Sequence, residues 1–466
     1  MKQFLILFLV LIQGQALQAA NVETLKLPEP KVSRLSNGLT VVWFERESIP
    51  VADLIFVSKA GYRNDPKGKA GVVELLSNMM QKGAGEYSDL ELSKEIEKLG
   101  ASRMVSADDD SFTVGMHGLA SDSPRLLELL YKQVTSPLLQ EADFFNAHDK
   151  ILDRLNHIGD SADLLASLLF HRVTANGTDY FRAGFSSKTE FNTVQLSDVL
   201  TQYKRVFNPT HSILILVGRV KQEQMMPAVN KTFGTWSSGG VSLSAYSITD
   251  KKFLTRSNKV LFLGRKDLTQ AEFRIGFRFS KLEPKERFVA AVFNALMGEY
   301  FNSRLNSILR DKLGLTYSVS SSLSFNHSYT RWQMSAATRN EKSGEFLKQA
   351  INIMKTTAID GVTAAEVEQA KAYLLGSYPI GMSTLPAVAS RWLVGQIYEM
   401  DPSYFNGYPQ GVAAVSKEDV NRWIKKYFKI EIMTKVVSGD EQAVQKSLYQ
   451  SGFGSIQKFQ ISDLLR

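Results

Sequence analysis

A short polar stripe runs along an otherwise apolar segment at residues 71–82. Its members are spaced i, i+3, i+4 and i+7, which places them on one face of an α-helix: Glu74, Ser77, Asn78 and Gln81. Because the rest of the segment is apolar, the helix is predicted to be buried, and a buried carboxylate needs a partner. Helices that present side chains at i and i+4 commonly build metal sites. One carboxylate, one hydroxyl and one amide are too poor a ligand set for zinc, so no zinc ion is expected here.

A second candidate site is an arginine and a tyrosine that flank a predicted helix end, Arg310 and Tyr317. Gly314 between them suits a helix C-cap, so Arg310 is expected to end a helix and Tyr317 to open the next strand. The two side chains can then lie close across the turn. A guanidinium and a phenol can donate hydrogen bonds to a peptide carbonyl, or to the oxyanion that develops on it. The alternative is structural, with Arg310 on a solvated helix end and Tyr317 packed on a sheet.

The composition excludes several other chemistries. The chain has no cysteine, which rules out disulfides, thiolate zinc sites and cysteine nucleophiles. Of the six histidines, only His148 and His157 share a segment, and they face opposite sides of a helix, so no histidine metal site is expected. Asp108-Asp109-Asp110 lacks the spacing of a calcium loop and is interpreted as a solvated turn or strand end. The net charge of +8 comes without a basic aromatic tract, and no nucleic-acid partner is expected.

The first 20 residues have the pattern of a secretory signal peptide. Lys2 is followed by an apolar run at 4–12 and a small-residue end at Ala19-Ala20. A secreted chain without cysteine indicates a bacterial periplasm. The alternative is a permanent N-terminal membrane anchor, for which the apolar run is short.

The chain is predicted to contain two or more domains, because 466 residues exceed what one hydrophobic core usually holds. Asn37-Gly38 predicts a hairpin turn flanked by strands at 40–44 and 51–57. Helical periods follow at 71–82, 89–99, 123–134, 141–156 and 161–171. The polar stretch at 236–257 is interpreted as a linker between domains at 21–235 and 258–466.

The second half repeats the order of the first. A strand at 272–279 precedes helices at 284–298 and 302–313, and a hairpin turns at Asn326-His327-Ser328. Lys98-Leu99-Gly100 returns as Lys312-Leu313-Gly314 after 214 residues, and two further segments return after 221. Two copies of an α+β unit of about 210 residues are therefore predicted.

Blocks along nearly all of the mature chain resemble the insulinase/pitrilysin family of zinc metallopeptidases, in its bacterial, processing-peptidase-like branch. These blocks lie at 35–42, 60–61, 68–71, 168–170, 217–218, 303–305, 317–319, 370–371, 376–379 and 408–415. The resemblance implies an α+β fold with two homologous domains. Each would be a mixed or antiparallel sheet with helices packed on one side, and together they would form half of a clam shell.

The family carries H-x-x-E-H, two zinc ligands around a catalytic glutamate, on its first helix, and a third glutamate ligand on a later helix. Aligned on the lysine and glycine that follow the helix, these positions fall on Glu74, Ser77 and Asn78, and the third ligand falls on Arg154. The resemblance therefore implies a non-catalytic member that binds no metal or other cofactor. A buried Glu74–Arg154 ion pair would fill the vacated place. The alternative is that Glu74 points to solvent or pairs elsewhere.

These inferences predict a zinc-free subunit of a periplasmic heteromeric metallopeptidase. Arg310 and Tyr317 resemble the pair that zinc peptidases of this family present from a second domain or subunit. The partner would be a homologous chain that carries zinc, and the two chains would enclose an unfolded peptide that pairs with an edge strand. The chain is not expected to be active alone, and in isolation it is compatible with a homodimer. The alternatives are a non-proteolytic peptide-binding chaperone or scaffold, and an envelope assembly subunit.

Overall fold

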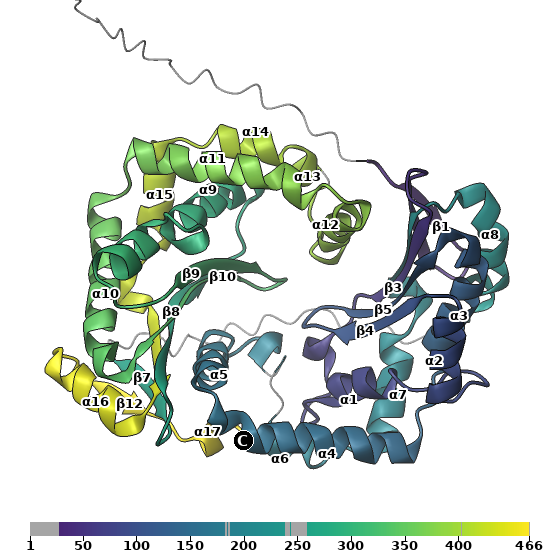
Figure 1. Ribbon diagram of the computed structural model, residues 1–466, viewed down its shortest axis with the longest axis horizontal. Coiled ribbons are helices and arrows are strands. Elements are labelled where there is room, and N and C mark those ends of the chain that lie inside the picture. Colours follow the sequence, from purple (N-terminus) through teal and green to yellow (C-terminus); the bar gives the residue numbers. More distant parts are fainter. Residues whose placement is uncertain are drawn as a thin grey trace, which may run out of the picture.

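The structure is a computed structural model that describes residues 28–465 apart from 182–183, 185–186, 238–242, 244–258 and 402. The predicted signal peptide at 1–20, and most of the predicted linker at 236–257, lie outside the described residues. The described part forms two units, each with its own sheet and helices (Figure 1). We call residues 28–243 the N-terminal unit and residues 259–465 the C-terminal unit.

The N-terminal unit is built on a six-stranded mixed sheet with the strand order β1-β2-β6-β3-β5-β4. Its strands are β1 (Lys31–Arg34), β2 (Thr40–Glu45), β3 (Val51–Ser58), β4 (Ser102–Ala107), β5 (Phe112–Leu119) and β6 (Ser212–Gly218). Its helices of eight or more residues are α1 (Val72–Met79), α2 (Asp89–Lys98), α3 (Ser123–Thr135), α4 (Glu141–His157), α5 (Ala162–Thr174), α7 (Leu196–Val206) and α8 (Gln222–Lys231). Its short elements include η1 (Tyr62–Asn64), η4 (Asp179–Phe181) and α6 (Lys188–Phe191). The helical periods of the sequence are thus found within a few residues of their expected bounds.

The Asn37-Gly38 turn joins β1 to β2, and Gly38 has the positive φ of +93° that this tight turn requires. The prediction that 40–44 and 51–57 flank one hairpin turn is wrong, because β6 lies between β2 and β3. β6 pairs parallel with β2 and antiparallel with β3. A strand as apolar as β2 needs a partner on both edges, and β6 comes from a segment too distant in sequence for a local pattern to predict.

The C-terminal unit has a second six-stranded sheet with the order β12-β7-β11-β8-β10-β9. Its strands are β7 (Val260–Gly264), β8 (Gln270–Phe279), β9 (Val319–Phe325), β10 (Thr330–Arg339), β11 (Thr434–Gly439) and β12 (Ile456–Lys458). Its helices are α9 (Pro284–Asn294), α10 (Ser343–Asp360), α11 (Ala364–Gly381), α12 (Leu385–Ile397), α13 (Ser403–Asn406), α14 (Tyr408–Ala413), α15 (Lys417–Tyr427), α16 (Glu441–Gln450) and α17 (Ile461–Leu464). The predicted hairpin at Asn326-His327-Ser328 is present as the β9–β10 turn.

The two sheets confirm the internal duplication and the α+β fold class. Five strands occupy the same places in both sheets, with the same relative directions, and only the outermost strand differs, since β1 pairs antiparallel and β12 pairs parallel. The repeated Lys-Leu-Gly segments end equivalent helical turns. Gly100 and Gly314 both adopt the left-handed conformation, with φ of +58° and +59°.

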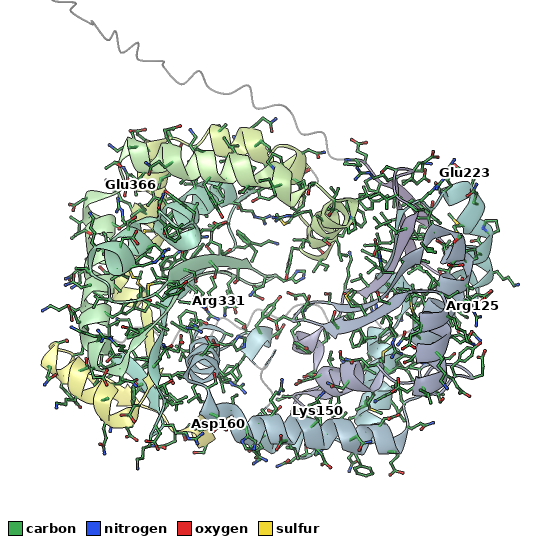
Figure 2. All side chains as sticks on the ribbon, viewed as in Figure 1. Arg125, Lys150, Asp160, Glu223, Arg331 and Glu366 are labelled. Carbon is green, nitrogen blue, oxygen red and sulfur yellow. The ribbon has the colours of Figure 1, made fainter. Side chains whose placement is uncertain are left out.

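Each sheet is covered on its second face by a helix from the other unit. α5 of the N-terminal unit packs its leucines and Phe170 against β7 and β11 of the second sheet. Conversely, α12 of the C-terminal unit packs against β2 and β6 of the first sheet. Figure 2 shows Arg331 of β10 beside α5. Its guanidinium lies 5.9 Å from the centroid of the Phe170 ring of that helix. The family resemblance implied helices on one face of each sheet. The exchange of α5 and α12 between the units adds a helix to the second face of each sheet.

The exchange explains the charged residues of β8. Phe273, Ile275 and Phe277 point into the core of the C-terminal unit, as their alternation predicts. Arg274 faces the other way, yet it is only 5% exposed because α5 covers it. Asp163 of α5 forms an ion pair with it. A polar face on a strand therefore marks a contact between units here, not a solvated surface.

The segment around Arg310 departs from regular α-helix. α9 continues into a π-helical turn, η7 (Ala295–Glu299), and the predicted helix at 302–313 is a short π-helix, η8 (Asn306–Lys312). Tyr317 does not open the next strand, because β9 begins two residues later at Val319. Widened helical turns of this kind are rare and often accompany functional sites. None of the helices in the described part of the chain is long and apolar enough to cross a membrane.

Candidate functional site

The helix at the predicted zinc position is α1, and its start is fixed by a carboxylate. Gly71 precedes it in the left-handed conformation, and the Asp65 carboxylate accepts hydrogen bonds from the backbone N–H groups of Gly71 (2.6 Å) and Val73 (2.8 Å). A carboxylate at a helix N-terminus is stabilised by the backbone dipoles. The apolar side chains of α1 are fully buried, as the sequence predicts.

Glu74 and Arg154 lie together, as predicted. A terminal nitrogen of the Arg154 guanidinium on α4 lies 2.8 and 2.9 Å from the two carboxylate oxygens of Glu74. The prediction of a buried pair is wrong in one respect, because the Arg154 side chain is 53% exposed while that of Glu74 is 18% exposed. The long arginine side chain reaches the carboxylate from the solvent side of α4, so water screens the pair.

The residues at the predicted zinc positions do not suit a zinc ion. The Glu74 carboxylate is engaged by Arg154, and the Asn78 side-chain amide donates to the backbone carbonyl of Glu74, 2.9 Å away. Ser77, the remaining α1 residue among the predicted zinc-site positions, is buried. Nearby, burial and the Glu74 carboxylate raise the pKa of the Tyr62 phenol to about 12, so this phenol stays protonated. Within the described ranges, no group of three or more histidine, aspartate or glutamate side chains is placed to hold a metal ion.

Arg310 and Tyr317 also lie together, in the C-terminal unit. The Arg310 guanidinium lies 5.7 Å from the centroid of the Tyr317 ring. Tyr317 is 89% exposed, which excludes the alternative of a tyrosine packed on the sheet. The Arg310 side chain is 27% exposed. A donor pair that faces solvent is available to a molecule outside this chain.

The loop that carries Tyr317 is fixed by hydrogen bonds on both sides. Thr316 places its hydroxyl 2.7 Å from the carbonyls of Ser318 and Ala337. The Asn306 side chain donates to the carbonyl of Val319 (2.7 Å) and accepts from its N–H (3.1 Å). The tyrosine backbone is therefore held in place while its side chain projects outward.

Phe301 is a member of this site that the sequence interpretation missed. The Arg310 guanidinium lies 4.0 Å from the Phe301 ring centroid, closer than to Tyr317, and Phe301 is 61% exposed. A guanidinium over an aromatic face is attracted by the ring electrons. The sequence offered one signal for this role. Phe301 is a large aromatic residue in the polar turn that follows Glu299, where no hydrophobic core is expected to bury it.

The two candidate pairs belong to different units. Among the described residues, no hydrogen bond, ion pair or ring contact joins Arg310 or Tyr317 to Glu74 or Arg154. The donor pair and the degenerate zinc position are therefore separate sites that do not contact each other.

The interpretation of Asp108-Asp109-Asp110 as a solvated turn is wrong for its last member. Asp110 is 1% exposed and forms an ion pair with Arg63 at 2.5 Å. Its two oxygens also accept hydrogen bonds from the hydroxyls of Tyr180 (2.7 Å) and Tyr398 (3.0 Å). Tyr398 directly follows α12, so groups of both units surround the Asp110 carboxylate.

The chain is a duplicated six-stranded α+β unit in which each half lends a helix to the other. The positions expected to hold zinc offer no zinc ligand set. These features define a two-unit peptidase fold without its metal motif. The chain belongs to the insulinase family, peptidase family M16. Residues 41–184 match the family described as "Insulinase (Peptidase family M16)", and residues 193–374 match "Peptidase M16 inactive domain". The predicted family is thus confirmed, and the sequence contains no H-x-x-E-H.

Known proteins similar to the chain match it over most of its length. A protein of Helicobacter pylori named "Non-peptidase homolog YmxG" is 24% identical over 93% of this chain and 98% of its own. An uncharacterized zinc protease of Streptomyces coelicolor is 22% identical over 83% of this chain and 84% of its own.

Solved structures share the fold. The peptidase M16 inactive domain of Pseudomonas fluorescens aligns with a TM-score of 0.79 at 19% identity, covering 88% of this chain and 98% of that one. The periplasmic protease PqqL of Escherichia coli aligns with a TM-score of 0.73 at 15% identity, covering 89% of this chain and 47% of that one.

Proposed function

We propose that this chain is the zinc-free subunit of a periplasmic two-chain peptidase. It would supply Arg310 and Tyr317 to the active site of a homologous, zinc-bearing partner and help to enclose an unfolded peptide. The observation that carries the proposal is the exposure of Tyr317, at 89%, beside a guanidinium on a loop fixed by Thr316 and Asn306. An exposed donor pair on a rigid support has no evident use within the chain itself.

The chemistry follows from the two donors. The partner's zinc would activate water and polarise the scissile carbonyl. The Tyr317 phenol and the Arg310 guanidinium would donate hydrogen bonds to the carbonyl oxygen, and these bonds strengthen as negative charge develops on it. A pre-positioned donor gains most in the transition state because it needs no reorganisation during the reaction.

Further observations support the remaining parts of the proposal. The absence of H-x-x-E-H and the occupied Glu74 carboxylate argue against activity of the chain alone. One relative of similar length is named a non-peptidase homolog. The signal-peptide pattern at 1–20, together with a structural neighbour named as periplasmic, supports the periplasm.

The test is affinity capture of the tagged mature chain from the periplasm of its native cells, followed by peptidase assays of the captured complex. We expect a stoichiometric companion that carries H-x-x-E-H, and cleavage of unfolded peptides that chelators abolish. Arg310→Lys and Tyr317→Phe should each lower cleavage without loss of the companion. Tyr449→Phe, at a 54% exposed tyrosine elsewhere in the unit, serves as the control.

Other outcomes would overturn the proposal. A companion without the zinc motif would favour the envelope-assembly or scaffold functions. Unchanged cleavage in both variants would remove the proposed role of the donor pair even if the complex exists.

A further inference from the structure

A cleft in the C-terminal unit carries an unusual concentration of cationic and aromatic groups. It lies between α9, η7, β9, α11 and the α12–α14 segment, and its volume is about 390 Å³ (Figure 1 shows these helices together). That size falls in the range of small-ligand pockets. Its lining residues are distinct from Arg310, Tyr317 and the α1 positions, so an inference about it is independent of the proposed function.

Arg287 is the central feature of this cleft. The side chain comes from α9, is 8% exposed, and lies with its guanidinium 5.8 Å from the ring centroids of both Phe325 and Tyr404. Its Nε is buried without a hydrogen-bond partner. Among the described residues, no ion pair or hydrogen bond engages Arg287 at all. A buried charge without a carboxylate destabilises a fold, so its presence here needs an explanation other than stability.

The cleft contains a second cation and one carboxylate. Arg391 of α12 lines it, and no residue of the described ranges forms an ion pair with it. Glu299 is the carboxylate, and it accepts a hydrogen bond from the Asn294 side chain at 2.8 Å. Desolvation raises the pKa of the Glu299 carboxyl. Two guanidiniums and a single carboxyl group leave the cleft with an excess of positive charge.

The remaining walls are apolar and aromatic. Leu323 and Phe325 of β9, Leu374 of α11, and Tyr404 and Tyr408 line the space around the guanidinium. The Tyr378 hydroxyl is already used, since it donates to the carbonyl of Phe405 at 2.7 Å. A ligand for this cleft therefore needs one anionic group for Arg287 and an apolar group for the rings.

We propose that this cleft binds a carboxylate that carries an apolar or aromatic group, with Arg287 as its ion-pair partner and Arg391 closing over it. A planar guanidinium matches a carboxylate with two parallel hydrogen bonds, which a point charge such as lysine does not reproduce. Two sources present this chemistry: the C-terminal residue of a short peptide, and a small aromatic acid.

The test is calorimetric titration of the mature chain with three probes: N-acetyl-Ala-Phe as the free acid, the same dipeptide as its C-terminal amide, and 3-phenylpropionate. We expect the free acid to bind and the amide to bind at least tenfold more weakly. Weaker binding of 3-phenylpropionate than of the peptide acid assigns the cleft to peptide ends, and equal or tighter binding assigns it to small acids. Equal binding of acid and amide, or no binding of either acid, overturns the proposal.

Substitutions separate binding from folding. Arg287→Met should weaken binding of the acid at least tenfold while leaving the denaturation midpoint equal to or above that of the parent, because an unpaired buried charge is removed. Arg422→Met, at an arginine whose side chain is 74% exposed, is the matched control and should change neither quantity. If Arg287→Met does not fold, Arg391→Met at the exposed rim should still weaken binding severalfold. Unchanged affinity in the folded variants would overturn the proposal.

Discussion

The carboxylate of Asp110 in the N-terminal unit accepts a hydrogen bond from the hydroxyl of Tyr398 in the C-terminal unit, over 3.0 Å. Asp110 lies in the β4–β5 turn, and the equivalent β9–β10 turn approaches it, with His327 Nε2 3.8 Å from Asp110 Oδ1. The tips of two equivalent hairpins therefore meet between the units (Figure 1). Arg63 and Tyr180 also contact this carboxylate.

The first prediction concerns this junction. Asp110→Asn should lower the free energy of unfolding by about 3 kcal/mol, since the Arg63 guanidinium loses its buried carboxylate and two tyrosine hydroxyls lose a charged acceptor. Urea denaturation measures the change. Asp149→Asn, at a side chain that is 82% exposed, is the control and should stay within about 0.5 kcal/mol of the parent. Equal effects of the two substitutions would contradict a structural role for Asp110.

The second prediction is a loss of stability on acidification. Burial and the nearby Arg63 guanidinium lower the pKa of His327 to about 4, below the usual value of 6.5. The folded state therefore favours the neutral ring, and the stabilisation present above pH 6.5 is lost as the pH falls toward 4. Between pH 8 and pH 5 this loss is about 2 kcal/mol. His327→Gln should flatten this part of the stability curve measured by urea denaturation.

Two neighbours bear on the size of that effect. Burial also lowers the pKa of His171, to about 3. Protonation of His171 therefore destabilises the fold as the pH falls, in the same direction as His327. The stability curve of His327→Gln should keep a residual slope for this reason. Asp109 has a pKa raised to about 6 by burial and by Asp110, and it stabilises the fold as the pH falls, which offsets part of the loss. A variant curve that is as steep as that of the parent would contradict the assignment to His327.

Local patterns predicted the repeated elements well. The Lys-Leu-Gly segments predicted helix ends, and Gly100 and Gly314 adopt the left-handed conformation there. The alternation of Phe273, Ile275 and Phe277 predicted a strand with one buried face. These features depend on neighbours in sequence, where the period of a helix or strand is decisive.

Contacts between the units could not be predicted in the same way. Asp110 and Arg274 carry charges that a local pattern assigns to water, yet both are buried, and each has a partner in the other unit, Tyr398 for Asp110 and Asp163 for Arg274. The same limit applies to Phe301, whose role depends on a guanidinium nine residues later and on a π-helical turn. The pairing of Glu74 with Arg154 was predictable only through the family resemblance, because no spacing rule links residues 80 apart.

The third prediction concerns the Glu74–Arg154 pair. Glu74→Gln and Arg154→Gln should each cost about 1 kcal/mol or less, because the arginine side chain is half exposed and water screens the pair. A double-mutant cycle by urea denaturation isolates the interaction. A coupling energy of several kcal/mol would show instead that the pair behaves as a buried one.

The fourth prediction is that the family's zinc site can be rebuilt, since Glu74 and Arg154 already face each other. Glu74→His, Ser77→Glu and Asn78→His combined with Arg154→Glu would supply two histidines, one carboxylate ligand and a separate glutamate. We expect this variant to retain about one zinc ion per chain after dialysis, measured by mass spectrometry of metals. The three α1 substitutions without Arg154→Glu are the control and should retain less. No uptake by the full variant would mean that positions 74, 78 and 154 do not converge as ligands.

The fifth prediction rests on the proposed two-chain peptidase, in which Phe301 would position Arg310. The ring holds the guanidinium at 4.0 Å, and such a contact at an exposed site contributes about 0.5–1 kcal/mol, so Phe301→Ala should lower kcat by about two- to fivefold. Phe301→Trp should restore the rate, because the aromatic face is kept. Arg310→Ala should cost about 100-fold, as expected for loss of an oxyanion donor. In the Arg310→Ala background, Phe301→Ala should have no further effect, and an additive loss would show that Phe301 acts on the substrate directly instead of through Arg310.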